Sequence, residues 1–283
     1  MTGESAESEL LRRVLASYRD VPDARLRELM GVLSRHLFAF VQEAQLTKAE
    51  WSQAIEFLTA VGRACSATHQ EFVLLSDVLG MSTLVEINAQ GPLTSETVGT
   101  VLGPVYRDDS PWRENGASLV ELDDGGQCIE LSGTVRSVSG APLAGATVDV
   151  WGCASNGLYP SQDPGQPPTN LRGIFTTGHD GSYRFITLRP ANYSVPTEGP
   201  VGALLRATRR SPGRAAHLHL WVRAPSHRDV ITHVFDAASG NLATDAAFSV
   251  CGTLVRRMEP VGQGPTPVQF DITLAPDRQG LHS

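Results

Sequence analysis

The sequence has no run of apolar residues near the ~18 that a membrane-spanning helix requires, which excludes an integral membrane protein. It also lacks a basic stripe: the net charge is −7, and a nucleic-acid-binding surface needs clustered lysine and arginine. Residues Met1–Glu9 are acidic and polar, without the features of a secretory signal. The few cysteines are dispersed and are interpreted as small buried side chains: Cys65, Cys128, Cys153 and Cys251. These absences predict a cytoplasmic protein without nucleic-acid or membrane partners.

Helical periodicity dominates the first third of the chain. Apolar residues recur at three- and four-residue steps over 10–15 and again over 26–40. Asp23 is a start signal for the second of these segments, and Thr47 with Glu50 has the form of a capping box. Two further helices are predicted, over about 70–80 and 82–88.

Strand patterning replaces the helical periodicity from Cys128 onward. Apolar residues then alternate with polar ones, and turn signals such as Asp180-Gly181 and Ser239-Gly240 separate the segments. The chain is therefore expected to be mainly β, with a β-sandwich preceded by an α-helical N-terminal region. Its only basic cluster, residues 206–210, is expected on a solvated loop.

The segment His217-Leu218-His219 gives the first indication of chemistry. It belongs to an apolar run rich in strand formers, and alternate residues of a strand share a face. The two histidine side chains therefore point to the same side from positions about 7 Å apart along the backbone. Two such imidazoles can chelate one metal ion. Tyr159 and Tyr193 lie upstream in proline-rich loops that can aim one side chain, although a lone tyrosine is usually a half-buried ring with a solvated hydroxyl.

Five segments in order resemble the landmarks of the intradiol ring-cleaving dioxygenases, enzymes that use ferric iron to open catechols. They are Val148–Trp151 with Asn156–Tyr159, Asn170–Gly173, Asp180–Phe185, Tyr193 with Val195–Gly202, and Arg214 with Ala216–His219. Their order and spacing over most of the chain make the resemblance specific.

The resemblance implies a non-haem Fe(III) site with one ion per subunit. Tyr159 and His217 would be equatorial ligands, Tyr193 and His219 axial ligands, and a hydroxide would complete the coordination. A hard trivalent cation favours anionic oxygen donors and lowers the pKa of a coordinated phenol from its ordinary value of ~10. This set differs from the two-histidine, one-carboxylate sites of Fe(II) oxygenases.

The resemblance further implies an aromatic diol and O2 as substrates. The diol would displace the hydroxide and Tyr193, and Tyr193 would take up one substrate proton. Both oxygen atoms would enter the ring between the adjacent hydroxyls, giving a cis,cis-muconate-type diacid. Arg214 would face the ring and stabilise its developing negative charge, unless it is a surface ion-pair residue.

Two helical segments, Glu71–Gly80 and Leu84–Asn88, are most similar to those of the hydroxyquinol 1,2-dioxygenases within this family. Asp77 would then accept a hydrogen bond from the third hydroxyl of benzene-1,2,4-triol, which catechol lacks; a charge on the helix surface is the alternative. The product would be 3-hydroxy-cis,cis-muconate or maleylacetate. The positions that match this subfamily's substrate pocket are Leu74, Asp77, Val101, Leu102, Gly103, Pro104, Val105, Val195, Pro196, Arg214 and Ala247.

Several positions depart from the residues usual in the family. Val105 stands where phenylalanine is usual, which predicts a roomier pocket and leaves the preferred ring substituent open. His233 stands where many catechol enzymes carry glutamine, and it is expected beside the metal ligands rather than as a fifth ligand. The remaining departures replace proline at Asn192, Ser194 and Ala215 and aspartate at Glu198.

Three other functions compete with this interpretation. The first keeps the chemistry but takes catechol or a substituted catechol as the substrate. The second is a binding module without catalysis on a transthyretin-like sandwich, since one fold can host enzymes and non-enzymes. The third is a zinc hydrolase built on His217 and His219, for which the sequence offers no spaced carboxylate or third histidine of the usual kind.

The helical region carries more apolar surface than the cap of a sandwich needs. Resemblance to the family implies that residues 1–98 form a helical dimerisation or linker domain and residues 99–283 the catalytic β-sandwich. It also implies a homodimer through the helices, with an apolar channel that holds lipid.

Overall fold

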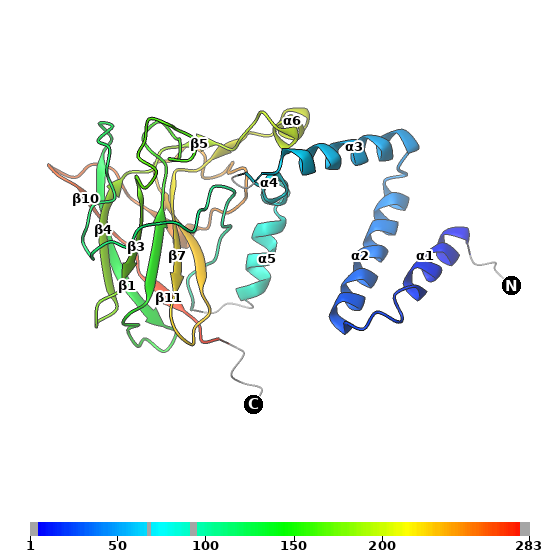
Figure 1. Ribbon diagram of the computed structural model, residues 1–283, viewed down its shortest axis with the longest axis horizontal. Helices are drawn as coiled ribbons and strands as arrows, with labels where there is room; N and C mark the ends of the chain where they lie inside the picture. The colour runs from blue at the N-terminus through cyan, green and yellow to red at the C-terminus, as the bar shows by residue number, and fades with distance from the viewer. Residues whose placement is uncertain (1–4, 67–68, 91–94, 278–283) are drawn as a thin grey trace. The chain divides into compact units, whose positions relative to one another are not determined.

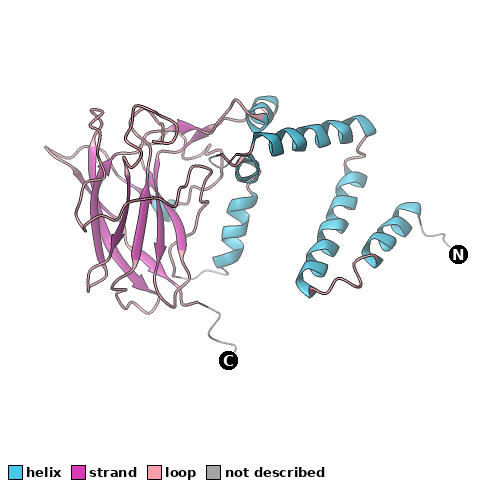
Figure 2. Cartoon of the chain, viewed as in Figure 1, coloured by secondary structure: helices cyan, strands magenta, loops and turns pink. Residues whose placement is uncertain are grey.

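The computed structural model describes residues 5–66, 69–90 and 95–277 (Figure 1). The chain forms two compact units, Met1–Ala60 and Val61–Ser283. Helices make up the N-terminal part and strands dominate the rest (Figure 2), which confirms the predicted fold class. The predicted domain boundary between residues 98 and 99 stays a prediction.

Three helices open the chain: α1 (Ala6–Ala16), α2 (Ala24–Glu43) and α3 (Lys48–Ala64). Asp23 caps α2 by accepting hydrogen bonds from the amides of residues 25 and 26, as expected. The predicted capping box also forms, because the Thr47 amide donates to Glu50 Oε2 at 2.8 Å and the Glu50 amide to Thr47 Oγ1 at 3.3 Å. Local side-chain chemistry thus sets where these helices begin.

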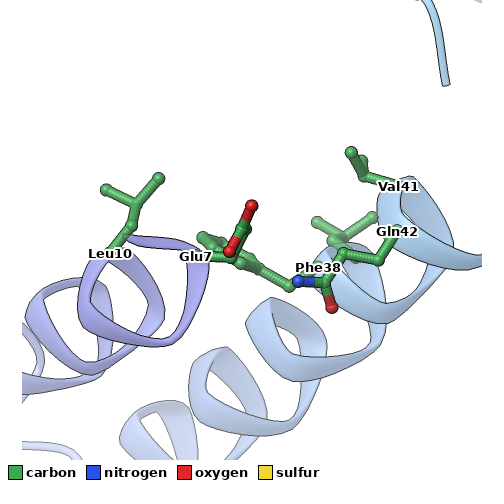
Figure 3. A pocket seen from close by; sticks show the side chains of 6 residues that line it. Glu7, Leu10, Phe38, Val41 and Gln42 are labelled. Carbon is green, nitrogen blue, oxygen red and sulfur yellow. The ribbon is translucent and has the colours of Figure 1, made fainter. Parts of the chain in front are cut away.

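The first unit leaves much of its apolar surface uncovered by the described residues of one chain. Leu37 and Phe40 on α2 are 53% and 57% exposed. Glu7 and Leu10 of α1 line an open pocket of about 320 Å³ together with Phe38, Val41 and Gln42 of α2 (Figure 3). Large exposed apolar patches mark interaction sites more often than not.

No single described helix is both long and apolar enough to cross a bilayer. Two short helices of the second unit, α4 (Glu71–Val78) and α5 (Met81–Gln90), satisfy the length and composition criteria only when taken together, with a 76° bend at the break between them.

Two sheets form the body of the second unit. Their strands are β1 (Cys128–Ser137), β2 (Thr147–Trp151), β3 (Arg172–Thr176), β4 (Ser182–Leu188), β7 (His217–Arg223), β8 (Val230–Asp236), β9 (Val255–Arg256), β10 (Thr266–Gln269) and β11 (Ile272–Leu274). One sheet is ordered β10-β1-β11, with β4 also paired to β1, and the other is ordered β3-β2-β7-β8-β9. A separate two-stranded sheet joins β5 (Tyr193–Ser194) to β6 (Gly213–Arg214).

The core lies between the two large sheets, as in a β-sandwich. Ile129 and Leu131 of β1 belong to the same buried cluster as Val148 of β2 and Leu218 of β7. Because side chains alternate along a strand, the odd-numbered histidines of β7 point away from this core. They are nevertheless buried, so other parts of the chain cover that face of the sheet.

Helix α6 (Pro200–Ala207) follows the Tyr193 segment, where the sequence analysis predicts only a rigid loop. Pro200 stands in its first turn, a position that suits proline, and Gly199 provides no side-chain cap. The buried Glu71 of α4 supplies the missing acceptor, because its Oε1 receives the Val201 amide at 2.9 Å. A residue distant in sequence thus helps to form this helix.

The expectation for the basic cluster 206–210 is wrong for one of its arginines. Arg210 is partly buried, donates to the carbonyl oxygens of Val78 and Ala246, and lies over the Phe248 ring at 4.8 Å. Arg210 therefore ties α4 to the 245–249 turn instead of lying free in solvent.

Candidate functional site

Strand register places three aromatic side chains in a row across neighbouring strands. Trp151 of β2 is opposite His219 of β7, which is opposite His233 of β8. The Trp151 ring stacks on the His219 ring with 4.6 Å between centroids and 12° between planes. His219 is therefore held on one side by an indole and on another by a second imidazole.

The four predicted metal ligands meet at this face of the sheet. Nε2 of His217 lies 3.1 Å from Nε2 of His219 and 3.4 Å from the Tyr193 oxygen, which in turn lies 3.5 Å from the Tyr159 oxygen. Two ligand atoms that are ~2 Å from one ion and roughly at right angles to each other lie about 3 Å apart. The spacing of these atoms fits shared coordination of one ion.

Close backbone contact brings the two tyrosines together. Tyr159 lies on the loop that connects β2 to β3, whereas Tyr193 belongs to β5. Gly157 has φ +79°, and a Cβ added there would lie 3.1 Å from the Tyr193 Cβ and 3.2 Å from the Asn192 carbonyl oxygen. Glycine at 157 therefore permits a turn and an approach that a larger residue would hinder.

Hydrogen bonds fix which nitrogen of each histidine faces the site. Nδ1 of His217 lies 2.5 Å from the Ala215 carbonyl oxygen, so it carries the proton and donates it. Nδ1 of His219 lies 2.9 Å from Nε2 of His233. Nε2 of His217 is then left with a lone pair toward the Tyr193 oxygen, and Nε2 of His219 is free to bind a metal when its Nδ1 donates to His233.

Burial determines the charges of these four groups. It raises the pKa of Tyr159 well above its ordinary value and also raises that of Tyr193, although the Arg214 charge opposes the second shift. Burial lowers the pKa of His217 to about 3, with Arg214 adding to the shift, and lowers the pKa of His219 well below its ordinary value. A bound trivalent cation would instead lower the pKa of both phenols, because it stabilises the phenolate, a hard anionic donor. The donor set and its spacing thus fit a ferric ion.

His233 adds a third imidazole to the neighbourhood of His217 and His219. The folded chain therefore does bring a third histidine to His217 and His219, contrary to the expectation from the sequence. The geometry still separates His233 from the other donors, because its Nε2 faces Nδ1 of His219 rather than the Nε2 atom that lies beside His217 Nε2. This arrangement agrees with His233 as a partner of a ligand.

A small cavity of about 20 Å³, room for about one water molecule, adjoins the tyrosines. Eight of the eleven predicted pocket residues line it: Leu74, Asp77, Pro104, Val105, Val195, Pro196, Arg214 and Ala247. Leu102 and Gly103 line an adjoining pocket of about 240 Å³, which shares Pro104 and Val105 with the first. Val101 is buried and lines neither.

Asp77 is buried in the wall of the small cavity, not on the helix surface. It is 2% exposed, and neither carboxylate oxygen has a hydrogen-bond partner among the described residues. Burial raises its pKa, and the nearby Ser82 hydroxyl and Arg214 charge offset only part of the shift. An unpartnered buried carboxylate is costly, which points to a ligand that supplies a donor.

The structure adds site residues that the sequence analysis missed. Gln162 lines the small cavity, and its Oε1 accepts the Tyr159 amide at 3.1 Å. Asp245 and Ser249 bind the Arg214 guanidinium. Gln162 is three residues from Tyr159, a spacing that could have suggested it. Residues 245 and 249 are more than 30 positions from residue 214 and meet it only in the folded chain, so no local sequence pattern predicts these contacts.

Comparison with known proteins agrees with this geometry. The family described as "Dioxygenase" matches residues 101–276, and the one described as "Catechol dioxygenase N terminus" matches residues 23–94. The chain is 41% identical to a hydroxyquinol 1,2-dioxygenase of Rhizobium sp. over 92% of this chain and 88% of the relative. It is 39% identical to a 6-chlorohydroxyquinol 1,2-dioxygenase of Cupriavidus pinatubonensis over 96% and 99%.

A solved structure is also similar over nearly the whole chain. The crystal structure of a hydroxyquinol 1,2-dioxygenase from Pseudomonas putida superimposes with a TM-score of 0.86 at 37% identity, covering 96% of this chain and 99% of the other. The N-terminal and the C-terminal part of the chain are therefore each similar to these proteins in sequence and in fold. The chain belongs to the intradiol ring-cleavage dioxygenase family.

Proposed function

We propose that the chain cleaves hydroxyquinol, benzene-1,2,4-triol, between its two adjacent hydroxyls and inserts both atoms of O2. The product is 3-hydroxy-cis,cis-muconate, or maleylacetate as its keto form. The observation that carries the choice of substrate is Asp77, a buried and unpartnered carboxylate in the cavity that also contains Tyr159, Tyr193 and Arg214. Catechol has no third hydroxyl to donate to it.

The proposed cofactor is one Fe(III) per subunit, held by Tyr159, Tyr193, His217 and His219. Their converging oxygen and nitrogen atoms support this assignment. Bound ferric iron would accept the deprotonated diol and make its ring reactive toward O2. Trp151 and His233 hold His219 in place, and Ala215 holds His217.

The remaining residues of the cavity have separate roles in this proposal. Tyr193, which lines the cavity, would release the metal as a phenolate and take up one proton of the diol at its oxygen. The Arg214 guanidinium stabilises the negative charge that develops on the ring, an effect that a buried and preorganised cation provides efficiently. Asp77 accepts the third hydroxyl, while Leu74, Val195 and Pro196 contribute apolar walls that exclude water.

The visible spectrum tests this function directly. The purified protein should contain iron and be burgundy through tyrosinate-to-iron charge transfer, and anaerobic hydroxyquinol should shift the band at lower concentration than catechol. In air, kcat/KM should favour hydroxyquinol. A colourless, iron-free protein without O2 uptake would support a binding module instead, and a clear preference for catechol would contradict the role of Asp77.

A single-residue control locates the metal. Tyr159→Phe removes one phenolate but keeps the ring, so the charge-transfer band should weaken and shift while the protein stays folded. Unaltered colour in this variant would contradict Tyr159 as a ligand.

We also propose that the chain forms a homodimer through its N-terminal helices, with lipid in an apolar channel. The exposed apolar side chains of α2 and the pocket between α1 and α2 support this proposal. Light scattering should give twice the chain mass at micromolar concentration, and a monomer would contradict it. Extraction followed by mass spectrometry tests for lipid. The cytoplasmic location stays a prediction.

A further inference from the structure

Asp245 is a buried carboxylate whose oxygens are fully engaged. It is 5% exposed and lies on the irregular segment after β8. Oδ1 accepts the Ala247 amide at 3.1 Å, the Ser249 amide at 3.4 Å and the Ser249 hydroxyl at 3.2 Å. These three donors come from its own turn and fix the direction of the carboxylate.

The second oxygen of Asp245 holds Arg214. Oδ2 accepts the Arg214 Nε proton at 2.9 Å, and both side chains are 2% exposed. Arg214 Nη2 donates to the Ser249 hydroxyl at 3.1 Å. The third nitrogen, Nη1, makes no hydrogen bond to the described protein atoms, and Arg214 lines the small cavity. Two of the three nitrogens are thus held by the 245–249 turn and one is left for a ligand.

The same Oδ2 atom also accepts the Ala215 amide at 2.9 Å. Ala215 in turn receives the Nδ1 proton of His217 at its carbonyl oxygen. One carboxylate therefore fixes the guanidinium and the backbone that orients a proposed metal ligand. The Arg214 guanidinium and the backbone next to the metal site thus contact the same carboxylate oxygen.

An arginine has several rotatable bonds, so a useful position must be imposed by its neighbours. A misplacement of about 1 Å can cost about a hundred-fold in rate, because charge stabilisation depends on orientation. Burial also requires the guanidinium to have a counter-charge, since a buried unpaired charge is strongly destabilising. Asp245 meets both needs without contacting the substrate.

We infer that Asp245 is the positioning residue that aims Arg214 at the ring of the bound diol, with Ser249 as its auxiliary. This inference rests on the proposed function, since it concerns how Arg214 acts in that reaction. The rate of ring opening depends on Asp245 through its contact with Arg214, whereas its contact with the Ala215 amide supports the metal site and is followed separately through iron content.

The test compares Asp245→Asn with the wild type and with Arg214→Ala in single-turnover ring cleavage of hydroxyquinol. Asp245→Asn should lower the rate by about a hundred-fold and change KM by less than about three-fold. The double variant should be no slower than Arg214→Ala alone, because two residues that act as one unit are not additive. Iron content and the charge-transfer band should stay within about 20% of the wild type in all three.

The matched control is Asp236→Asn. Asp236 is also buried and also pairs with an arginine Nε, that of Arg189 at 2.6 Å, but it does not line the cavity. This variant should lose thermal stability and keep its rate per bound iron. If Asp245→Asn does not fold, Ser249→Ala, which removes one contact to each partner, should lower the rate by several-fold at unchanged iron content.

Two results would overturn the inference. One is a full additional rate loss when Asp245→Asn is added to Arg214→Ala, which would give Asp245 an independent role. The other is a folded Asp245→Asn with the wild-type rate per iron. A wild-type protein without ring-cleaving activity would instead refute the proposed function, so the two failures are distinguishable.

Discussion

His219 and His233 face each other across β7 and β8 with 2.9 Å between Nδ1 and Nε2. If Nε2 of His219 binds the metal, its Nδ1 must carry the proton, and His233 Nε2 is the acceptor. Such contacts orient a ligand and raise its basicity. An amide oxygen at position 233 could therefore accept the same hydrogen bond from His219.

This relationship predicts a graded loss of iron affinity at position 233. His233→Ala should weaken iron binding by about 10- to 100-fold, whereas His233→Gln, which keeps an acceptor, should stay close to the wild type. Competition against a chelator, followed by the charge-transfer band, measures both. Equal losses in the two variants would indicate that the imidazole itself is needed.

Asp77→Asn should change substrate choice more than overall activity. The variant loses the charge that accepts the third hydroxyl, so kcat/KM for hydroxyquinol should fall about ten-fold while that for catechol changes little. Asp149→Asn is the control, because Asp149 is also buried with an unpartnered oxygen but does not line the cavity. Parallel losses on both substrates would argue against recognition by Asp77.

Asp77→Asn should also stabilise the folded protein at neutral pH. Burial raises the pKa of Asp77, so its contribution to stability is full below the unfolded value and declines as pH rises through the folded one. Removing the charge should raise Tm at pH 7 by about 2–4 °C, equivalent to about 1 kcal/mol, and the gain should shrink toward pH 4. Thermal melts of the iron-free proteins from pH 4 to 8 measure this. A gain independent of pH would mean that another property of asparagine causes it.

Val105 lines both the small cavity and the larger pocket beside it. Val105→Phe should fill part of this space and lower kcat/KM for chlorinated hydroxyquinols about ten-fold more than for hydroxyquinol itself. The ratio of the two specificity constants is the measurement, and Val138→Phe, at an exposed position, is the control. An unchanged ratio would show that substituents do not approach residue 105.

Glu71→Ala should destabilise the fold near α6. The buried carboxylate accepts the Val201 amide and lies 2.6 Å from Nε2 of His69. Its loss leaves the first turn of α6 without an acceptor and should cost about 2 kcal/mol, or about 4–8 °C in Tm. Glu71→Gln keeps the acceptor and should lose less. If the Glu71→Ala variant has the same Tm as the wild type, a water molecule replaces the carboxylate as the acceptor.

The sequence predicts those features that depend on neighbouring residues. Asp23 and the Thr47–Glu50 pair cap their helices as expected, because the groups that bond are three residues apart or fewer. The shared face of His217 and His219 also follows from strand periodicity alone. These elements are encoded locally.

Features that depend on distant contacts are not visible in the sequence. Helix α6 needs a carboxylate from residue 71, and Arg214 needs residue 245, so no local pattern reveals either. The convergence of Tyr159 and Tyr193 is predicted only through resemblance to the family. Register across β2, β7 and β8, which places Trp151 and His233 on either side of His219, also requires the fold.

The stacking of Trp151 on His219 gives the protein an internal fluorophore at the site. Trp51 and Trp112 are 58% and 65% exposed, whereas Trp151 is fully buried. Its emission is therefore expected at shorter wavelength than theirs and should respond to a change at the stacked imidazole. The binding of an ion at His219 should therefore change the emission of this indole without any label.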